Sequence, residues 1–191
     1  MKERAKKWAV KHAEGPHARF WLAAVSFSEA SFFLVPPDVL LIAILLTSAK
    51  RWVYYAGFTT IFSVLGGVFG YGIGMIFFDL AGEPLVRLYN LEEQIKTVGG
   101  LFEKSAFLAI FSAAFTPIPF KVFTISAGLF NINFVTFIIA SLLGRGIRFF
   151  AIAGLLRLYG KSVGALIYRY FNIASLLLVL ALIVGVLIFV Y

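Results

Sequence analysis

The stretch Phe32 to Leu46, FFLVPPDVLLIAILL, is as apolar as a membrane-embedded segment but carries two prolines and an aspartate in its middle. Proline removes a backbone donor and disfavours helix in the residue before it. We therefore expect two short half-helices with a non-helical turn at Pro36-Pro37-Asp38. Such a turn survives at membrane depth only where protein or a water-filled cavity covers its backbone.

The composition of the whole chain is that of an integral membrane protein. Of its 191 residues, 61% are hydrophobic and 14% are charged, and the mean hydropathy is +0.95, which excludes an ordinary soluble domain. The first apolar segment is too long for a signal peptide, so we expect it to be retained. The net charge of +8 gathers at segment ends, which fits lipid headgroups and not nucleic acid. No cysteine is present, which excludes disulfides.

The apolar segments predict one all-α membrane domain. A helix needs about 20 apolar residues to span the hydrocarbon, and two of the segments are interrupted by prolines. The predicted order is a basic interfacial helix (1–19), a re-entrant hairpin (20–49), a transmembrane helix (52–78), an amphipathic connection (79–104), a second re-entrant hairpin (105–130), and two transmembrane helices (133–156 and 173–191). The fold class is therefore two re-entrant hairpins with about three transmembrane helices and amphipathic surface helices.

The two interrupted segments resemble each other. A shift of 83 residues lays LVPPDVLLIA, from Leu34, over PIPFKVFTIS, from Pro117, and places Asp38 opposite Lys121. Each is followed by a spanning segment that contains glycine, so we interpret the chain as an inverted repeat, in which paired interrupted segments indicate a transport site. The predicted hairpin tips are Pro36, Pro37, Pro117 and Pro119. The glycines that recur every four residues, which predict close helix packing, are Gly66, Gly70 and Gly74.

The distribution of charge predicts an orientation. Residues 1–19 and the segment before the last helix are basic, so both are expected on the cytoplasmic side of the cell membrane. The connection 79–104 holds five acids against three bases, and we expect it to lie along the outer surface with a break at Gly99-Gly100. Charge bias does not distinguish re-entrant from spanning segments, because both models keep the two basic regions inside.

Five ionisable side chains fall within apolar segments, where a charge costs at least a few kcal/mol and marks a pathway. They are Glu29, Asp38, Lys121, Arg145 and Arg148. The two arginines are three residues apart, so they project from one helix face and suit bidentate binding of a phosphate. Half-helix ends add backbone donors for an anion. One positive charge remains in surplus, which a phosphate monoanion would cancel, and protonation of one acid would admit a dianion.

Three motifs resemble the DedA family, which shares the VTT domain with eukaryotic lipid scramblases, and in particular its YqaA-like branch. They are SEASFFLVPPDVLLIA, FTPIPFKVFTISAG and GRGIRFF. The resemblance implies two facing re-entrant hairpins and transport of lipid, particularly undecaprenyl phosphate, that depends on the proton motive force. It assigns the family's acidic pair to Glu29 and Asp38, and its paired arginines to Arg145 and Arg148. Many members carry an arginine where this chain has Ala114, which leaves the substrate open.

The leading hypothesis is a transporter or scramblase for a phosphate-bearing lipid. The lipid is expected to be a phospholipid or a polyprenyl phosphate, and its transport is expected to be coupled to protons. The alternatives are a proton-driven transporter of small ions or cationic solutes and a non-transporting membrane organiser. As structural alternatives, Asp38 caps a hairpin, Glu29 forms a structural bridge, and the arginines snorkel. No nucleophile–base pair or metal-ligand cluster is evident, so no enzyme, cofactor or metal is expected, and the oligomeric state stays open.

Overall fold

The computed structural model describes most of the chain between residues 17 and 159. The described residues are 17–32, 36–47, 49–88 and 92–159, together with Tyr170, Ile173, Leu176 and Leu177. All secondary structure in these residues is helical and they contain no strand, which confirms the predicted all-α class. The predicted interfacial helix 1–19 and the predicted transmembrane helix 173–191 lie almost entirely outside the described residues.

Both interrupted segments fold as two helices that flank the prolines. The first consists of α2 (Ala18–Ser31) and α3 (Pro37–Thr47), and Pro37 stands at the first helical position, where its missing N–H costs nothing. The second consists of α6 (Glu92–Phe115) and α7 (Phe120–Leu129), with Pro119 extended just before α7. Both predicted helix breaks are therefore confirmed, but the predicted turn at Pro36-Pro37-Asp38 is wrong for its last two residues, because Pro37 and Asp38 begin α3.

Among the described residues, two helices are long enough to cross a membrane. They are α4 (Trp52–Phe77) and α8 (Phe134–Tyr159), each of 26 residues, which corresponds to about 39 Å at 1.5 Å per residue. Both satisfy the length and composition of a span. The apolar helices α3 and α7 have 11 and 10 residues, which is about half of what a crossing requires. Short connecting elements are η1 (Ala49–Arg51), η2 (Phe78–Gly82) and α5 (Glu83–Leu88).

The predicted break at Gly99-Gly100 is wrong. The helix α6 runs without interruption from Glu92 to Phe115, so the connection 79–104 continues directly into the first arm of the second hairpin. Glycine inside a helix costs about 1 kcal/mol relative to alanine, which tertiary packing outweighs here. One turn along, Phe102 packs edge-on against Phe130 at the end of α7, with ring centroids 5.8 Å apart.

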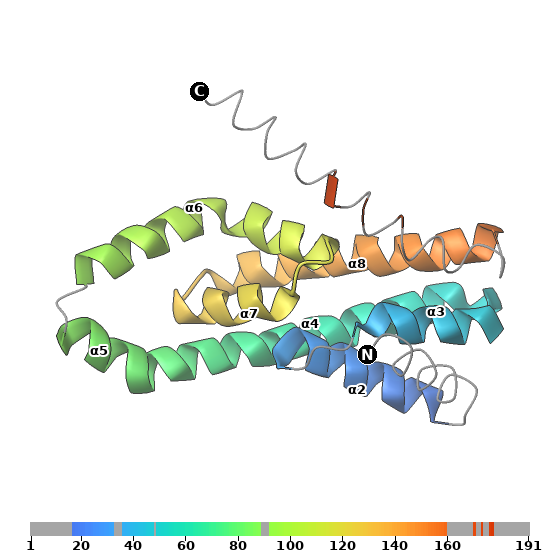
Figure 1. The fold of residues 1–191 in the computed structure, drawn as a ribbon, viewed down its shortest axis with the longest axis horizontal. Helices are drawn as coiled ribbons and strands as arrows, with labels where there is room; N and C mark the ends of the chain where they lie inside the picture. Colours follow the sequence, from blue (N-terminus) through green and yellow to red (C-terminus); the bar gives the residue numbers. More distant parts are fainter. Residues whose placement is uncertain are drawn as a thin grey trace.

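The helices form two antiparallel halves around α4 and α8. Figure 1 shows that α2 and α3 diverge from their break toward one end of the bundle, whereas α6 and α7 diverge toward the opposite end. The two hairpins also exchange their packing partners. In the first hairpin α2 lies on α4 and α3 lies on α8, whereas in the second α6 lies on α8 and α7 lies on α4. This opposed arrangement is the pattern that an inverted repeat produces.

Two separate apolar cores occupy the two ends of the bundle. The first apolar core joins α2 and α3 to the beginning of α4 and the end of α8, and includes Leu22, Leu41 and Phe149. The second apolar core joins α6 and α7 to the opposite parts of α4 and α8, and includes Ile110 and Phe137. Between them is a polar layer of buried side chains, which consists of Asp38, Thr59, Thr60, Ser63, Ser141, Arg145 and Arg148.

The glycines of α4 let the hairpins approach its backbone. A Cβ at Gly66 would collide with the carbonyl of Phe27 in α2, and one at Gly74 would collide with the carbonyl of Ile125 in α7. Gly70 lies between the two contacts, against the Thr124 side chain. The backbones of α4 and of both hairpins are therefore closer than any side chain permits.

We expect Gly66→Ala to destabilise the protein, because α2 or α4 must shift to admit the methyl group, at a cost of roughly 1–3 kcal/mol. Gly72→Ala is the matched control, since no atom lies within 4 Å of its Cβ position. Thermal unfolding midpoints in detergent measure the difference. Equal midpoints for the two variants would contradict the close packing of α2 on α4.

Candidate functional site

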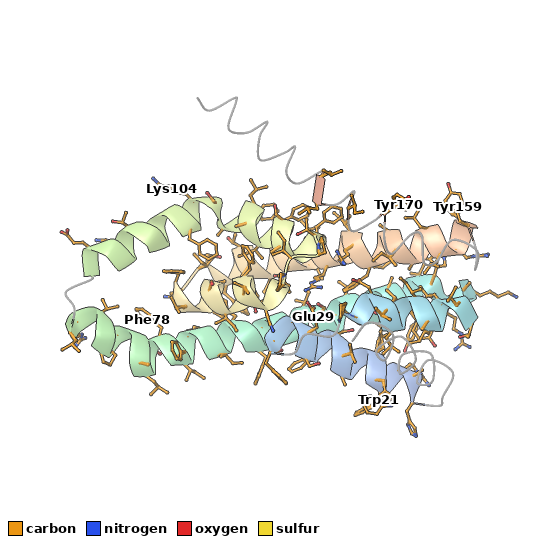
Figure 2. The ribbon with its side chains drawn as sticks, in the orientation of Figure 1. Trp21, Glu29, Phe78, Lys104, Tyr159 and Tyr170 are labelled. Atoms are coloured by element: carbon orange, nitrogen blue, oxygen red, sulfur yellow. The ribbon has the colours of Figure 1, made fainter. Side chains whose placement is uncertain are left out.

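Four of the five predicted charges meet at the polar layer: Asp38, Arg145 and Arg148 belong to it, and the partly buried Glu29 pairs with Arg145. Arg145 and Arg148 project from the middle of α8 and receive one acid from each arm of the first hairpin. Glu29 comes from α2 near its end, and Asp38 from the first turn of α3. Figure 2 shows Glu29 at the middle of the bundle, where the two hairpins approach each other. The site is therefore a double ion pair at the junction of both halves.

The pair between Asp38 and Arg148 is fully buried and fully bonded. Arg148 Nε donates to Asp38 Oδ1 at 3.2 Å and Nη2 donates to Oδ2 at 2.5 Å. Both side chains are only 4% exposed. Because the two hydrogen bonds form the parallel fork that carboxylates accept best, α3 is held firmly against α8. Arg148 supplies both of these hydrogen bonds.

Arg148 also joins the second hairpin to this pair. Its Nη1 donates to the carbonyl of Phe115 at 2.9 Å. Phe115 is the last residue of α6, where carbonyls lack a donor from their own helix. One guanidinium thus connects the tips of both hairpins with the middle of α8.

The pair between Glu29 and Arg145 is looser. A single hydrogen bond joins Arg145 Nη2 to Glu29 Oε2 at 2.9 Å, and the Glu29 side chain is 15% exposed. The guanidinium lies 4.3 Å from the centre of the Phe120 ring, which contributes a cation–π contact. Arg145 Nε is buried and has no hydrogen-bond partner among the described residues. This pair can rearrange at a lower cost than the pair of Asp38 and Arg148.

Lys121 lies apart from these pairs. It occupies the first turn of α7, is half-buried, and forms no ion pair within the described part of the chain. Asp38 and Lys121, which the internal repeat places opposite each other, form no ion pair among the residues that the structure describes, and Asp38 instead binds Arg148. The physical reason is that α3 packs on α8 whereas α7 packs on α4.

In this conformation each arginine holds a carboxylate, so the site is closed to another anion. The four charges, three of them buried and that of Glu29 partly buried, cancel in pairs, which is the arrangement that buried ions require. No group of three metal-ligating side chains occurs within the described ranges.

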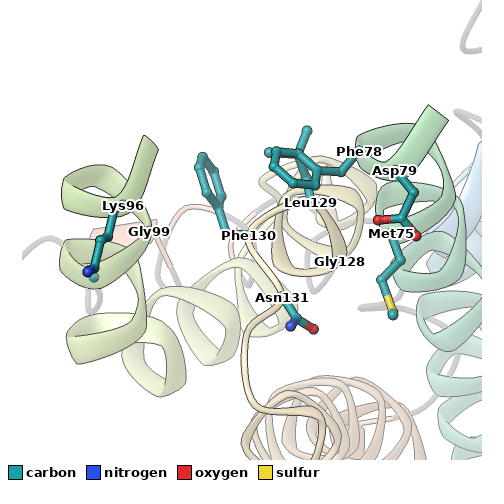
Figure 3. A pocket seen from close by; sticks show the side chains of 10 residues that line it. Met75, Phe78, Asp79, Lys96, Gly99, Gly128, Leu129, Phe130 and Asn131 are labelled. Atoms are coloured by element: carbon teal, nitrogen blue, oxygen red, sulfur yellow. The ribbon is translucent and has the colours of Figure 1, made fainter. Parts of the chain in front are cut away.

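A cavity of about 550 Å³ lies elsewhere, at the end of the bundle near the start of α6. Figure 3 shows Asp79 and Lys96 on opposite sides of it, with Phe130 between them. The cavity is remote in sequence and position from the ion pairs, and it has none of their residues in its lining.

Sequence reasoning missed four groups at the site, namely the Phe115 carbonyl, the Phe120 ring, and the hydroxyls of Ser63 and Ser141. The carbonyl could have been found, because a helix that ends before Thr116-Pro117 leaves free acceptors. The ring and the hydroxyls belong to common residue types, and only the packing of the helices distinguishes them.

Comparison with known proteins places this architecture in a family. Residues 35–158, which hold both proline breaks, α4 and almost all of α8, match the VTT domain. The chain belongs to the DedA family of VTT-domain proteins. Proteins of this family are membrane-associated, and the two long apolar helices agree with that placement.

Relatives of this VTT-domain protein occur in bacteria and archaea. An uncharacterized protein of Haemophilus influenzae is 38% identical over 165 residues, which cover 86% of this chain and 83% of the relative. An uncharacterized protein of Histophilus somni is 32% identical, covering 78% and 77% of the two chains. One of Methanocaldococcus jannaschii is 33% identical, covering 68% and 78%. No solved structure matches the chain significantly. Membership of the family supports a transporter-like role in a membrane.

Proposed function

We propose that this VTT-domain protein moves a phosphate-bearing lipid across the membrane at the junction of its two hairpins. The observation that carries the proposal is the pair of buried arginines at the middle of α8, each neutralised by a hairpin carboxylate. A guanidinium binds phosphate with the same planar fork that it uses for carboxylate. A lipid phosphate is therefore a natural replacement for either acid.

The placement in the bilayer is part of the proposal. In it, α4 and α8 cross the membrane, and the hairpins α2–α3 and α6–α7 enter from opposite faces and return. Support comes from the short apolar arms and from the outer faces of the long helices. Exposed side chains there are apolar, as lipid contact requires: Ile61, Leu65, Phe69 and Ile76 on α4, and Val135, Ile139, Leu143 and Ile147 on α8.

The two ion pairs take different parts in the proposed mechanism. The pair of Asp38 and Arg148 anchors both hairpins to α8, and the looser pair of Glu29 and Arg145 opens. When Glu29 takes up a proton it releases Arg145, which then pairs with the phosphate of the lipid. The charge in the layer stays balanced, because one phosphate negative charge replaces the carboxylate charge. Proton uptake is thus coupled to phosphate binding, while the lipid tails remain in hydrocarbon.

Purified protein in liposomes tests the function directly. Fluorescent phospholipid and polyprenyl phosphate are placed in one leaflet, and their appearance in the other leaflet is followed. We expect transport of at least one of them, and the comparison identifies the lipid class. A membrane organiser gives no flux of any kind, and a transporter of cationic solutes gives ion flux without lipid flux, so either result rejects the proposal.

Side-specific labelling tests the re-entrant placement in this chain, which has no native cysteine. Ala49→Cys, in η1 after the first hairpin, is expected to react with a membrane-impermeant thiol reagent from the side of the N-terminus. Asn131→Cys, between α7 and α8, is expected to react only from the opposite side. Labelling of Ala49→Cys only from the side opposite the N-terminus would show that the first segment spans.

A further inference from the structure

Two buried hydroxyl groups of the polar layer have no hydrogen-bond partner in the part of the chain that the structure describes. Ser63 on α4 and Ser141 on α8 are both 0% exposed, and within the described residues neither Oγ has a partner. Buried serine and threonine on these helices otherwise donate to the carbonyl four residues before, as Thr59 and Thr60 do. A buried polar group without a partner is costly, so these two positions require an explanation.

The two serines lie at the same level of the interface between α4 and α8. Two contacts show how the helices align. A Cβ at Gly146 on α8 would lie 3.8 Å from the Thr60 side chain on α4, and a Cβ at Gly67 on α4 would lie 3.4 Å from the Phe137 ring on α8. In this antiparallel pair Ser63 stands between Thr60 and Gly67, which places it opposite the turn of α8 that holds Ser141.

Arg145 adds a third unpaired donor at this level. It follows Ser141 by one helical turn, so both side chains leave the same face of α8. Its Nε is buried and finds no partner in the described ranges, although its Nη2 is bound to Glu29. Its guanidinium also lies against Phe120, a ring that in turn lies 3.3 Å from the Cβ position of Gly67 on α4.

We propose that Ser63 Oγ, Ser141 Oγ and Arg145 Nε form the seat of a phosphate group. The inference rests on the proposed function and deepens it by naming the donors that receive the headgroup. When Glu29 is protonated, Arg145 presents Nε and Nη2 as a fork to two phosphate oxygens, and the hydroxyls donate to the remaining oxygens. In the closed state the three donors have no partner among the described residues, which favours opening of the layer when a phosphate is present.

Binding and flux of serine variants test the seat. Ser63→Ala and Ser141→Ala are each expected to weaken binding of a short-chain polyprenyl phosphate about tenfold or more, because each loses a hydrogen bond to a charged group. Binding is measured as the rise of the thermal unfolding midpoint with ligand concentration. The matched control is Thr60→Val, whose hydroxyl is satisfied by the Ala56 carbonyl; its affinity should equal that of the wild type. Ser141→Cys, of similar size with a weaker donor, is a second variant in case an alanine variant does not fold.

Inorganic phosphate distinguishes the source of the group. A shift with the lipid but not with inorganic phosphate at the same concentration assigns the seat to a lipid headgroup, and a shift with both shows that the phosphate group suffices. Wild-type affinity for the lipid in both alanine variants would overturn the seat. The phosphate seat and the transport function can fail independently. If phosphate binding depends on the two serines but the wild type transports no lipid, the seat is retained and the transport function is rejected. If the wild type transports lipid and both serine variants bind phosphate as tightly as the wild type, only the seat is rejected.

Discussion

Arg148→Ala is expected to cost about 3–5 kcal/mol of folding free energy, because it leaves the buried Asp38 carboxylate without a counter-charge. Both side chains are only 4% exposed, so water cannot compensate. The variant also removes the donor that Arg148 supplies to the Phe115 carbonyl. We expect a lower unfolding midpoint in detergent and a loss of monodisperse protein, together with loss of lipid transport.

A double variant separates charge from packing. Asp38→Asn with Arg148→Met removes both charges and keeps similar volumes, so it is expected to be more stable than Arg148→Ala alone. Arg148→Lys is expected to be intermediate, since an ammonium is a point charge and cannot form the fork. Wild-type stability of Arg148→Ala would show that the pair does not anchor the hairpins.

Arg145→Ala is expected to abolish transport of lipid phosphates with a smaller effect on stability. The effect on stability is smaller because the Glu29 side chain is 15% exposed and loses a single hydrogen bond to Arg145. Arg145→Lys is expected to fail nearly as badly, because the planar fork and the Nε donor are both lost. The measurement is flux in liposomes beside the unfolding midpoint of the same preparations. Normal flux from Arg145→Ala would remove this residue from the mechanism.

The same pair predicts the response to protons. Glu29→Gln cannot exchange a proton, so transport by this variant is expected to ignore a pH gradient that accelerates the wild type. Glu83→Gln is the control, because Glu83 forms an exposed pair with Arg87 within α5, and exposed pairs contribute little. A gradient response that survives in Glu29→Gln would make Glu29 a structural partner of Arg145 only.

Much of the architecture could be predicted because its signals are local. Proline acts on its own turn and on the residue before it, so both helix breaks were visible in the sequence. Charged residues in apolar segments likewise indicated the polar layer. In contrast, the partner of Asp38 depends on which long helix lies beside α3, and the alignment of the internal repeat does not contain that information, so only the packing reveals Arg148.

The remaining features depend on tertiary packing. Gly99 and Gly100 are helix-disfavouring by propensity, yet α6 continues through them, because propensity is a weak preference that packing overrides. Ser63 and Ser141 resemble the other hydroxyl residues of the chain, and only the absence of a bond to the preceding turn distinguishes them. No single-residue pattern encodes that difference.

A reversible crosslink between the hairpins tests most directly the claim that lipid phosphates pass through their junction. Thr124 Oγ1 donates to the Ala30 carbonyl at 3.0 Å, which links α7 to α2 beside Glu29 and one turn from Phe120. Because the arginines are buried, a headgroup can reach them only if helices around the site move apart, and we expect α2 and α7 to be the helices that separate. The measurement is lipid flux through Ala30→Cys/Thr124→Cys before and after reduction, with each single variant as control. We expect flux to fall to background when the disulfide forms and to return on reduction. Full flux through the crosslinked protein would show that lipid phosphates do not pass through the junction of the two hairpins.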